Sequence, residues 1–264
     1  YIDSCSYNFG TSGGGKLVAV KYNSTGARQW YSISSKVAGY NSQVDVYAYS
    51  LTLDNNDSIY FTGSINGQAK FGSYSACTTW GSGGTCAFVA KISSSGTWQW
   101  AKASYKTVNS WSQATGTGIE YHSNMLYVSG SFTNSHSFGS AGTVSSSGNN
   151  DWFVVAISPS GVWNWTTKGG GANDDHAEGI SVDGTGIFVV GVFSTNSNAV
   201  ATFGSHTIST ADTSTHILVT KLSHSGTWQW VTKAGGTGDT DYGRAISSDG
   251  AGNVTVSGYF YSST

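Results

Sequence analysis

Charged residues are scarce in this chain of 264 residues, since Asp, Glu, Lys and Arg make up 10% of it, whereas about a quarter is usual. The 12 Lys and Arg are spread along the chain and the formal net charge is −2, so no basic stripe is available to neutralise nucleic-acid phosphates. Apolar runs are also short, and none approaches the roughly 18 residues that a membrane-spanning helix needs. We therefore expect neither a nucleic-acid partner nor a membrane span.

Residues that favour helices are also rare, since Met occurs once and Glu only at positions 120 and 178. The chain is rich instead in Gly (36 residues), aromatic residues (14%), Ser and Thr. This composition favours β-strands joined by tight turns, so we expect an all-β protein. The absence of an initiator Met and of a signal sequence predicts a processed product or a piece of a longer chain. A surface rich in Ser, Thr, Asn and Gly predicts an extracellular or cell-surface location.

Cysteine is limited to Cys5, Cys77 and Cys86. Cys77 and Cys86 flank a Gly-rich segment, and no further His or Cys stands at metal-ligand spacing around them. In an extracellular protein this arrangement favours a local disulfide over two free thiols. We predict a Cys77–Cys86 disulfide and leave Cys5 unpaired within this chain.

A short motif with two tryptophans recurs along the chain. It reads Gly-Thr-Trp-Gln-Trp at 96–100, Gly-Val-Trp-Asn-Trp at 161–165 and Gly-Thr-Trp-Gln-Trp at 226–230, with a degenerate copy at 26–30. The last tryptophans fall at 30, 100, 165 and 230, so the spacings are 70, 65 and 65 residues. A fixed period of this kind is the signature of a repeat protein.

Each repeat contains four runs with the alternating pattern of antiparallel strands, separated by turns rich in Gly or Asn. We therefore predict a β-propeller of four repeats of about 65 residues in a single domain, 1–264. The last blade would combine the first two strands, at the C-terminus, with the last two strands, near the N-terminus, because this removes open sheet edges. The predicted units are approximately 44–106, 107–168, 169–233, and 234–264 together with 1–43.

Several runs look like the bacterial SBBP-type β-propeller repeat. They are Phe88 to Gly96, Trp230 to Asp239 and Gly252 to Phe260, and Phe-Gly-Ser at 71, 138 and 203 resembles the long-repeat variety. The resemblance covers all four units and implies a propeller fold in a surface or secreted protein. Because that family is usually described as seven-bladed, the resemblance allows two forms, a whole four-bladed propeller or a four-blade segment of a larger propeller or array.

Up-and-down strand order predicts short turns at one end of each blade and long connections at the other. Long loops on a rigid scaffold commonly carry binding sites, so we predict that the long-loop face binds the ligand. The recurring tryptophan pairs are interpreted as packing between sheets, because they stand at the same place in every unit. The residues predicted to stack on a ligand are aromatic residues in or near the long loops, namely Phe71, Tyr74, Trp80 and Trp111.

Two Gly-rich loops between units carry paired carboxylates, Asp174 with Asp175 and Asp239 with Asp241. Carboxylates with Gly and Asn carbonyls are hard-oxygen ligands that suit Ca²⁺, so Ca²⁺ binding is one hypothesis and a turn-capping role is the other. The segment 174–178 is also the one dense titratable patch, but no nucleophile motif accompanies it. We expect a protein that is not an enzyme.

Four asparagines stand in the Asn-x-Ser/Thr pattern of N-glycosylation, Asn23, Asn56, Asn164 and Asn253. Chance also produces this pattern in a chain rich in these residues. The first functional hypothesis is a secreted binding module for a glycan or for a cell-surface or matrix protein, with the glycan preferred. The alternative is a structural or adhesive module that self-assembles in a surface fibre or appendage, and a third is an extracellular glycan-degrading enzyme, because propellers host such enzymes.

Overall fold

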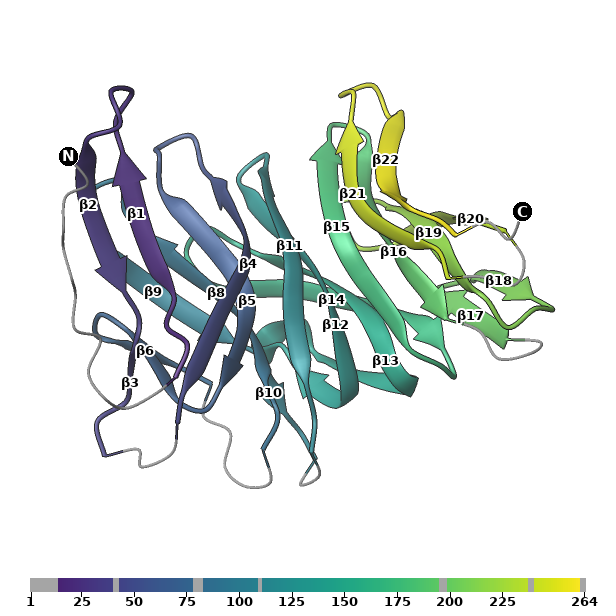
Figure 1. Ribbon diagram of the computed structural model, residues 1–264, viewed down its shortest axis with the longest axis horizontal. Coiled ribbons are helices and arrows are strands. Elements are labelled where there is room, and N and C mark those ends of the chain that lie inside the picture. Colours follow the sequence, from purple (N-terminus) through teal and green to yellow (C-terminus); the bar gives the residue numbers. More distant parts are fainter. Residues whose placement is uncertain are drawn as a thin grey trace.

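The computed structural model of the protein describes residues 14–39, 43–77, 83–108, 111–194, 199–236 and 240–261. Apart from one 3-10 turn at Gly139–Ala141, the regular elements in these residues are β-strands. The predicted all-β class is confirmed. Figure 1 shows the sheets side by side in chain order, with the tight hairpin turns toward the top of the view.

Three complete units of four strands form the middle of the molecule, and in each one the strands pair antiparallel in chain order. Unit I consists of β4 (Asp45–Leu53), β5 (Ile59–Asn66), β8 (Cys86–Ile92) and β9 (Trp98–Ala103). Unit II consists of β11 (Ala114–His122), β12 (Met125–Ser137), β13 (Thr143–Ile157) and β14 (Trp163–Gly171). Unit III consists of β15 (Asp175–Asp183), β16 (Gly186–Ser194), β19 (Thr215–Leu222) and β20 (Trp228–Ala234).

The two ends of the chain form separate two-stranded sheets. The N-terminal half-unit is β1 (Val18–Tyr22) paired with β2 (Arg28–Ile33), and the C-terminal half-unit is β21 (Tyr242–Ser248) paired with β22 (Val254–Tyr259). Figure 1 shows them at opposite ends of the row, and no described strand of one pairs with the other. The predicted last blade built from both chain ends is therefore wrong for this structure. Figure 1 shows that the row of units does not return on itself.

The long connections between second and third strands are β-arms. The arms contain β6 (Ala69–Phe71) with β7 (Tyr74–Ala76), the paired extensions of β12 and β13, and β17 (Ala199–Phe203) with β18 (His206–Thr210). Each arm also pairs with the chain that follows the preceding fourth strand or with that strand itself. These pairs are β3 (Ser35–Lys36) with β6, β10 (Tyr105–Lys106) with β12, and β14 with β17. The arms therefore tie neighbouring units together.

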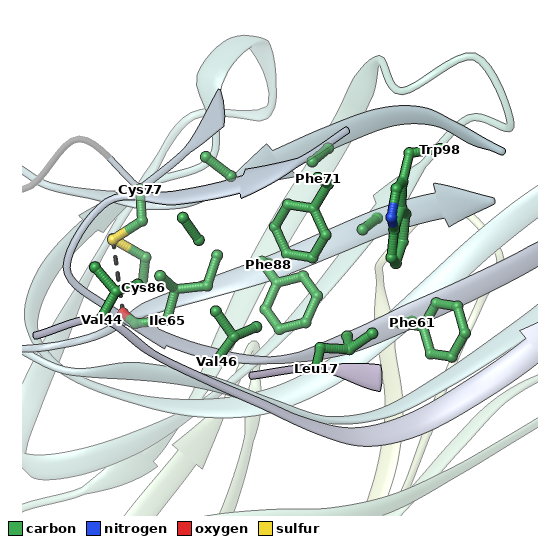
Figure 2. Packing of buried hydrophobic residues seen from close by; sticks show 14 of the residues in the cluster. Leu17, Val44, Val46, Phe61, Ile65, Phe71, Cys77, Cys86, Phe88 and Trp98 are labelled. Atoms are coloured by element: carbon green, nitrogen blue, oxygen red, sulfur yellow. Dashed lines mark hydrogen bonds between the residues drawn. A yellow bond between two sulfur atoms is a disulfide. The ribbon is translucent and has the colours of Figure 1, made fainter. Parts of the chain in front are cut away.

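The Phe-Gly-Ser motif of each arm packs on the first tryptophan of its own unit. Phe71 is fully buried, and its ring meets that of Trp98 edge to face, with centroids 5.1 Å apart. Units II and III repeat this contact at 5.4 and 4.9 Å. Gly72 turns the chain with a φ of 61°, and a Cβ there would lie 3.2 Å from Trp98, which explains why the motif needs glycine. Figure 2 shows Phe71 beside Phe88 in this core.

The second tryptophan of each pair joins its unit to the next one. Its indole N–H donates to a backbone carbonyl in the turn between third and fourth strands of the following unit. The donors and acceptors are Trp30 and Ser94 (2.8 Å), Trp100 and Pro159 (3.0 Å), and Trp165 and His224 (3.1 Å). The glycine two residues after each acceptor lies under the ring, so that a Cβ at Gly96 would be 2.7 Å from Trp30. We call this contact the indole–turn contact.

The predicted disulfide between Cys77 and Cys86 is confirmed, with their Cα atoms 5.8 Å apart. It links the end of the first arm to the start of β8, and both residues are buried in the core of unit I (Figure 2). Cys5 lies outside the described residues, so the prediction for it stays open.

Candidate functional site

Two contiguous depressions form a groove at the long-connection end of the molecule, between units II and III. Their volumes are about 220 and 300 Å³, and they share Gln113 and Asn150 in their walls. The walls come from the residues that lead into β11, from the arm of unit II and from the start of β15. Four side-chain amides line the groove, those of Gln113, Asn134, Asn149 and Asn150.

The amides of the unit II arm are held by defined hydrogen bonds. Asn150 Nδ2 donates to Asp174 Oδ1 at 2.7 Å, and Asn134 Nδ2 donates to the backbone carbonyl of Trp111 at 2.8 Å. Asn134 has a φ of 59°, a left-handed conformation that Asn tolerates better than most residues. These bonds join the arm to the Trp111 segment on one side and to the Asp174 loop on the other.

Hydrogen bonds from side-chain hydroxyls of unit II to the backbone of unit III fix the floor of the groove. Thr117 Oγ1 donates to the carbonyl of Ala177 at 2.8 Å, and the N–H of Ala177 donates to Ser131 Oγ at 3.1 Å. Two hydroxyl groups of unit II thus hydrogen-bond to the carbonyl and to the N–H of Ala177. The groove is therefore built on strands rather than on free loops, which favours a fixed geometry for its side chains.

A buried carboxyl group lies next to the groove. Asp175 is fully buried on β15 between Asp174 and His176, both of which line the groove. Its carboxylate accepts the N–H groups of Gly171 at 2.6 Å and Ser194 at 3.2 Å. Burial nevertheless raises the pKa of Asp175 to about 7, and the nearby charges of Asp151 and Asp174 add to this. This carboxyl group therefore titrates near neutral pH beneath the groove.

The structure separates the four residues predicted to stack on a ligand. Trp111 stands at the groove with 52% of its surface exposed, whereas Tyr74 is exposed on the arm of unit I. Phe71 is fully buried against Phe88 and Trp98, so the prediction that it stacks on a ligand is wrong, because its ring has no open face. Trp80 lies outside the described residues.

The carboxylates predicted to bind Ca²⁺ do not converge. Asp174 points to the groove amides, Asp175 binds backbone N–H groups, and the buried Asp241 accepts the N–H of Gly236 at 2.9 Å. Asp239 lies outside the described residues. Within the described part of the chain, no three His, Cys, Asp or Glu side chains gather as a metal site. The geometry of Asp175 and Asp241 matches the alternative, in which these residues hold their Gly-rich loops.

The titratable residues at 174–178 do not all face the same side of β15. Alternate residues of a strand point to opposite sides, so His176 and Glu178 line the groove while Asp175 points inward. Glu178 also forms an ion pair with Arg244 of the C-terminal half-unit at 3.2 Å. The groove thus offers amides, hydroxyls, one imidazole, two carboxylates and one indole ring, a set suited to hydrogen bonding and stacking.

Sequence reasoning missed the four groove amides. Three of them come from the arm of unit II, and Gln113 comes from the link between units I and II. A signal was present in Gly148-Asn149-Asn150, a polar run that breaks the apolar pattern of the following strand. The asparagines of the four glycosylation motifs, Asn23, Asn56, Asn164 and Asn253, are all exposed, and their modification stays a prediction.

No protein-family model matches the chain, and no curated protein matches it. Among the described residues there is also no helix with the length and apolar character needed to cross a membrane.

Proposed function

We propose that the protein is an extracellular, non-enzymatic binding module and that the groove between units II and III binds a glycan. The observation that carries the proposal is the placement of the exposed Trp111 ring beside the groove amides. Sugars present flat apolar C–H faces and a rim of hydroxyl groups, so they are bound by an aromatic face together with planar hydrogen-bonding side chains.

The electrostatics of the groove favour a neutral glycan over a strongly anionic one. Two carboxylates, Asp174 and Glu178, line it, and neither of the chain's two arginines does. A sulfated or phosphorylated ligand would meet the like charge of Asp174, at a cost in binding free energy, whereas the charge of Glu178 is paired with Arg244. Hydroxyl groups of a neutral sugar, by contrast, can donate to both carboxylates.

The fold proposed for this module is a segment of a β-propeller. Three successive four-stranded units stand side by side, each with short turns at one end and a long connection at the other, as propeller blades do. The resemblance to the SBBP-type repeat supports the same assignment, with the seven-bladed family form larger than this row. The extracellular setting is supported by the buried disulfide, because such bonds persist in oxidising compartments.

Retention on a broad glycan array, followed by titration of the retained glycan, tests the proposal. Trp111→Ala should weaken binding about tenfold, which corresponds to about 1.4 kcal/mol, because the ring supplies the stacking surface. Asn150→Ala should weaken it by a similar factor through loss of an amide and release of Asp174. Tyr74→Ala is the matched control, because Tyr74 is an exposed aromatic residue on another arm.

Two results would overturn this assignment. One is a protein that retains no glycan on the array. The other is a retained glycan whose affinity falls with Tyr74→Ala but not with Trp111→Ala, since binding would then lie outside the groove.

A further inference from the structure

The hydrogen-bond polarity of the groove narrows the class of glycan that it fits. Asn134 Nδ2 donates to the carbonyl of Trp111 at 2.8 Å, and Asn150 Nδ2 donates to Asp174 Oδ1 at 2.7 Å. Asn149 Nδ2 lies 3.5 Å from the other oxygen of the same carboxylate. Because a carbonyl and a carboxylate only accept hydrogen bonds, the nitrogen end of each amide has to face its protein partner.

The carbonyl oxygens of these three amides are left for a ligand. In the part of the chain that the structure describes, no N–H or O–H group donates to Oδ1 of Asn134, Asn149 or Asn150. An amide oxygen has two lone pairs, and an acceptor that is covered without a donor costs free energy. A ligand that fills the groove therefore has to bring hydrogen-bond donors.

The charged groups of the groove are acceptors as well. Glu178 is paired with Arg244, but no described Lys, Arg or His forms an ion pair with Asp174. None of the described residues that line the groove is Lys or Arg. The groove thus holds one carboxylate charge that no fixed cation of the described chain balances.

The exposed indole ring shares a depression with this charge. Trp111 and Asp174 both line the larger part of the groove, and 52% of the Trp111 surface is exposed. The face of an indole ring attracts cations through its quadrupole. A carboxylate and an indole ring in one depression therefore suit a ligand that has both a positive charge and an apolar face.

A protonated amine meets these demands better than a hydroxyl or an acetylated nitrogen does. An ammonium group has three N–H donors and no lone pair, so it can serve a carboxylate and two amide oxygens at once. Its bond to a carboxylate is roughly twice as strong as a bond between neutral groups. An N-acetyl group has a single N–H and adds a carbonyl oxygen, an acceptor of the kind that the groove already has in excess.

We infer that the glycan bound in the groove carries free amino groups and that one protonated amine binds between Asp174 and the amide oxygens of the unit II arm. The inference rests on the glycan binding proposed above and specifies the class of sugar, an amino sugar whose nitrogen is not acetylated. The ring of that sugar stacks on Trp111. Hydroxyl groups of the neighbouring sugar donate to the smaller depression, where Glu178 accepts them.

An array that presents each amino-sugar oligosaccharide in two forms, with the free amine and with the N-acetylated nitrogen, tests the inference. The assay is run at about pH 6, where amines are protonated and where Asp175, whose pKa is about 7, is mostly neutral. Titration of a retained pair should show at least about tenfold tighter binding of the amine form. Added salt should reduce this ratio, because it screens the ion pair.

Asp174→Asn separates charge from shape, because the new amide keeps an oxygen that accepts from Asn150. It should weaken binding of the amine form about tenfold and change binding of the acetylated form by less than about twofold. A misfolded variant would lose both forms, so the ratio reports the charge alone. Asp57→Asn is the matched control, because Asp57 is exposed in the turn between β4 and β5 and has a φ of 58°, which Asn tolerates.

The outcomes separate this inference from the proposed function. Equal retention of the amine and acetylated forms overturns the inference and leaves glycan binding in place, whereas an array that retains no glycan overturns both. A preference for the amine that Asp174→Asn leaves unchanged also overturns the inference. So does a lysine tetrapeptide that binds as tightly as the amine form of the glycan, because the groove would then recognise an amine without a sugar.

Discussion

Unit II and the C-terminal half-unit have the same strand pattern, but equivalent side chains are buried in unit II and exposed in the half-unit. Phe132 of unit II and Phe260 stand two residues after equivalent glycines, Gly130 in β12 and Gly258 in β22, yet Phe132 is fully buried and Phe260 is 72% exposed. The chemical difference between the two positions is small. What differs is the third strand, β13, which pairs with β12 beside Phe132, whereas no described strand pairs with the outer edge of β22. Burial in this protein is therefore a property of the neighbouring strands as much as of the residue.

We expect the largest effect from shortening one of two equivalent side chains, one in unit II and the other in the N-terminal half-unit, whose core positions are also exposed. Phe153 is fully buried between units I and II, and Val18 occupies the equivalent place on β1 with 52% exposed. Phe153→Ala should lower the free energy of unfolding by about 4 kcal/mol, because it removes apolar contacts and leaves a cavity. Val18→Ala should change it by less than about 0.5 kcal/mol in dilute solution. Urea unfolding of both variants measures this, and equal losses would contradict the comparison.

The seam between units II and III should lose stability as pH rises through 7, and the seam between units I and II should not. Burial raises the pKa of Asp175 to about 7, and the equivalent residue in unit II is Ala114. A raised pKa in the folded state means that stability is fully present below pH 4 and is lost as pH rises through 7. A rise from 3.8 to about 7, at about 1.4 kcal/mol for each pKa unit, corresponds to a loss on the order of 4 kcal/mol, which should be absent in Asp175→Asn.

The difference between the wild type and Asp175→Asn is the quantity to measure, because His136 acts in the opposite direction. Burial between Ser104 and Ser112 lowers the pKa of His136 to about 4, so its stabilising contribution is lost as pH falls from about 6.5 toward 4. Urea unfolding of both proteins at several pH values separates the two groups. A difference that does not vary between pH 4 and 8 would refute the assignment to Asp175.

Reduction of the disulfide distinguishes unit I from the two other units. The bridge between Cys77 and Cys86 closes a short loop, and chain entropy predicts a loss of about 2.5 kcal/mol when it is removed. The paired substitution Cys77→Ala with Cys86→Ala should show that loss in urea unfolding. Hydrogen exchange should rise most in the arm of unit I and least in unit III. Faster exchange throughout the chain would instead indicate that the units unfold as one.

The smallest expected effect concerns a single hydrogen bond. Trp165→Phe keeps most of the ring but removes the indole N–H that reaches the carbonyl of His224, so we expect a loss of about 1 kcal/mol in the dilute protein. Trp230→Phe should have almost no effect, because no described carbonyl group accepts its indole N–H as the carbonyl of His224 accepts that of Trp165. A stability loss of equal size for both substitutions in dilute solution would contradict this.

The sequence by itself determined the elements of this protein. Alternating apolar residues, Gly-rich turns and a fixed period specify strands, their order and their antiparallel pairing, because these depend on residues close together in the chain. The Cys77–Cys86 bridge could be predicted for the same reason, since nine positions separate the two thiols. The role of the tryptophan pairs in packing also followed from their recurrence in each unit.

The tertiary structure alone decided what depends on distant residues. The two half-units lie at opposite ends of the row, although the period allowed closure. Phe71 reads as a loop aromatic in sequence but is buried, because its arm folds back onto Trp98. The groove gathers Trp111, Asn150 and Asp174 from segments of two units. No local pattern encodes that meeting, because it is set by how one unit packs against the next.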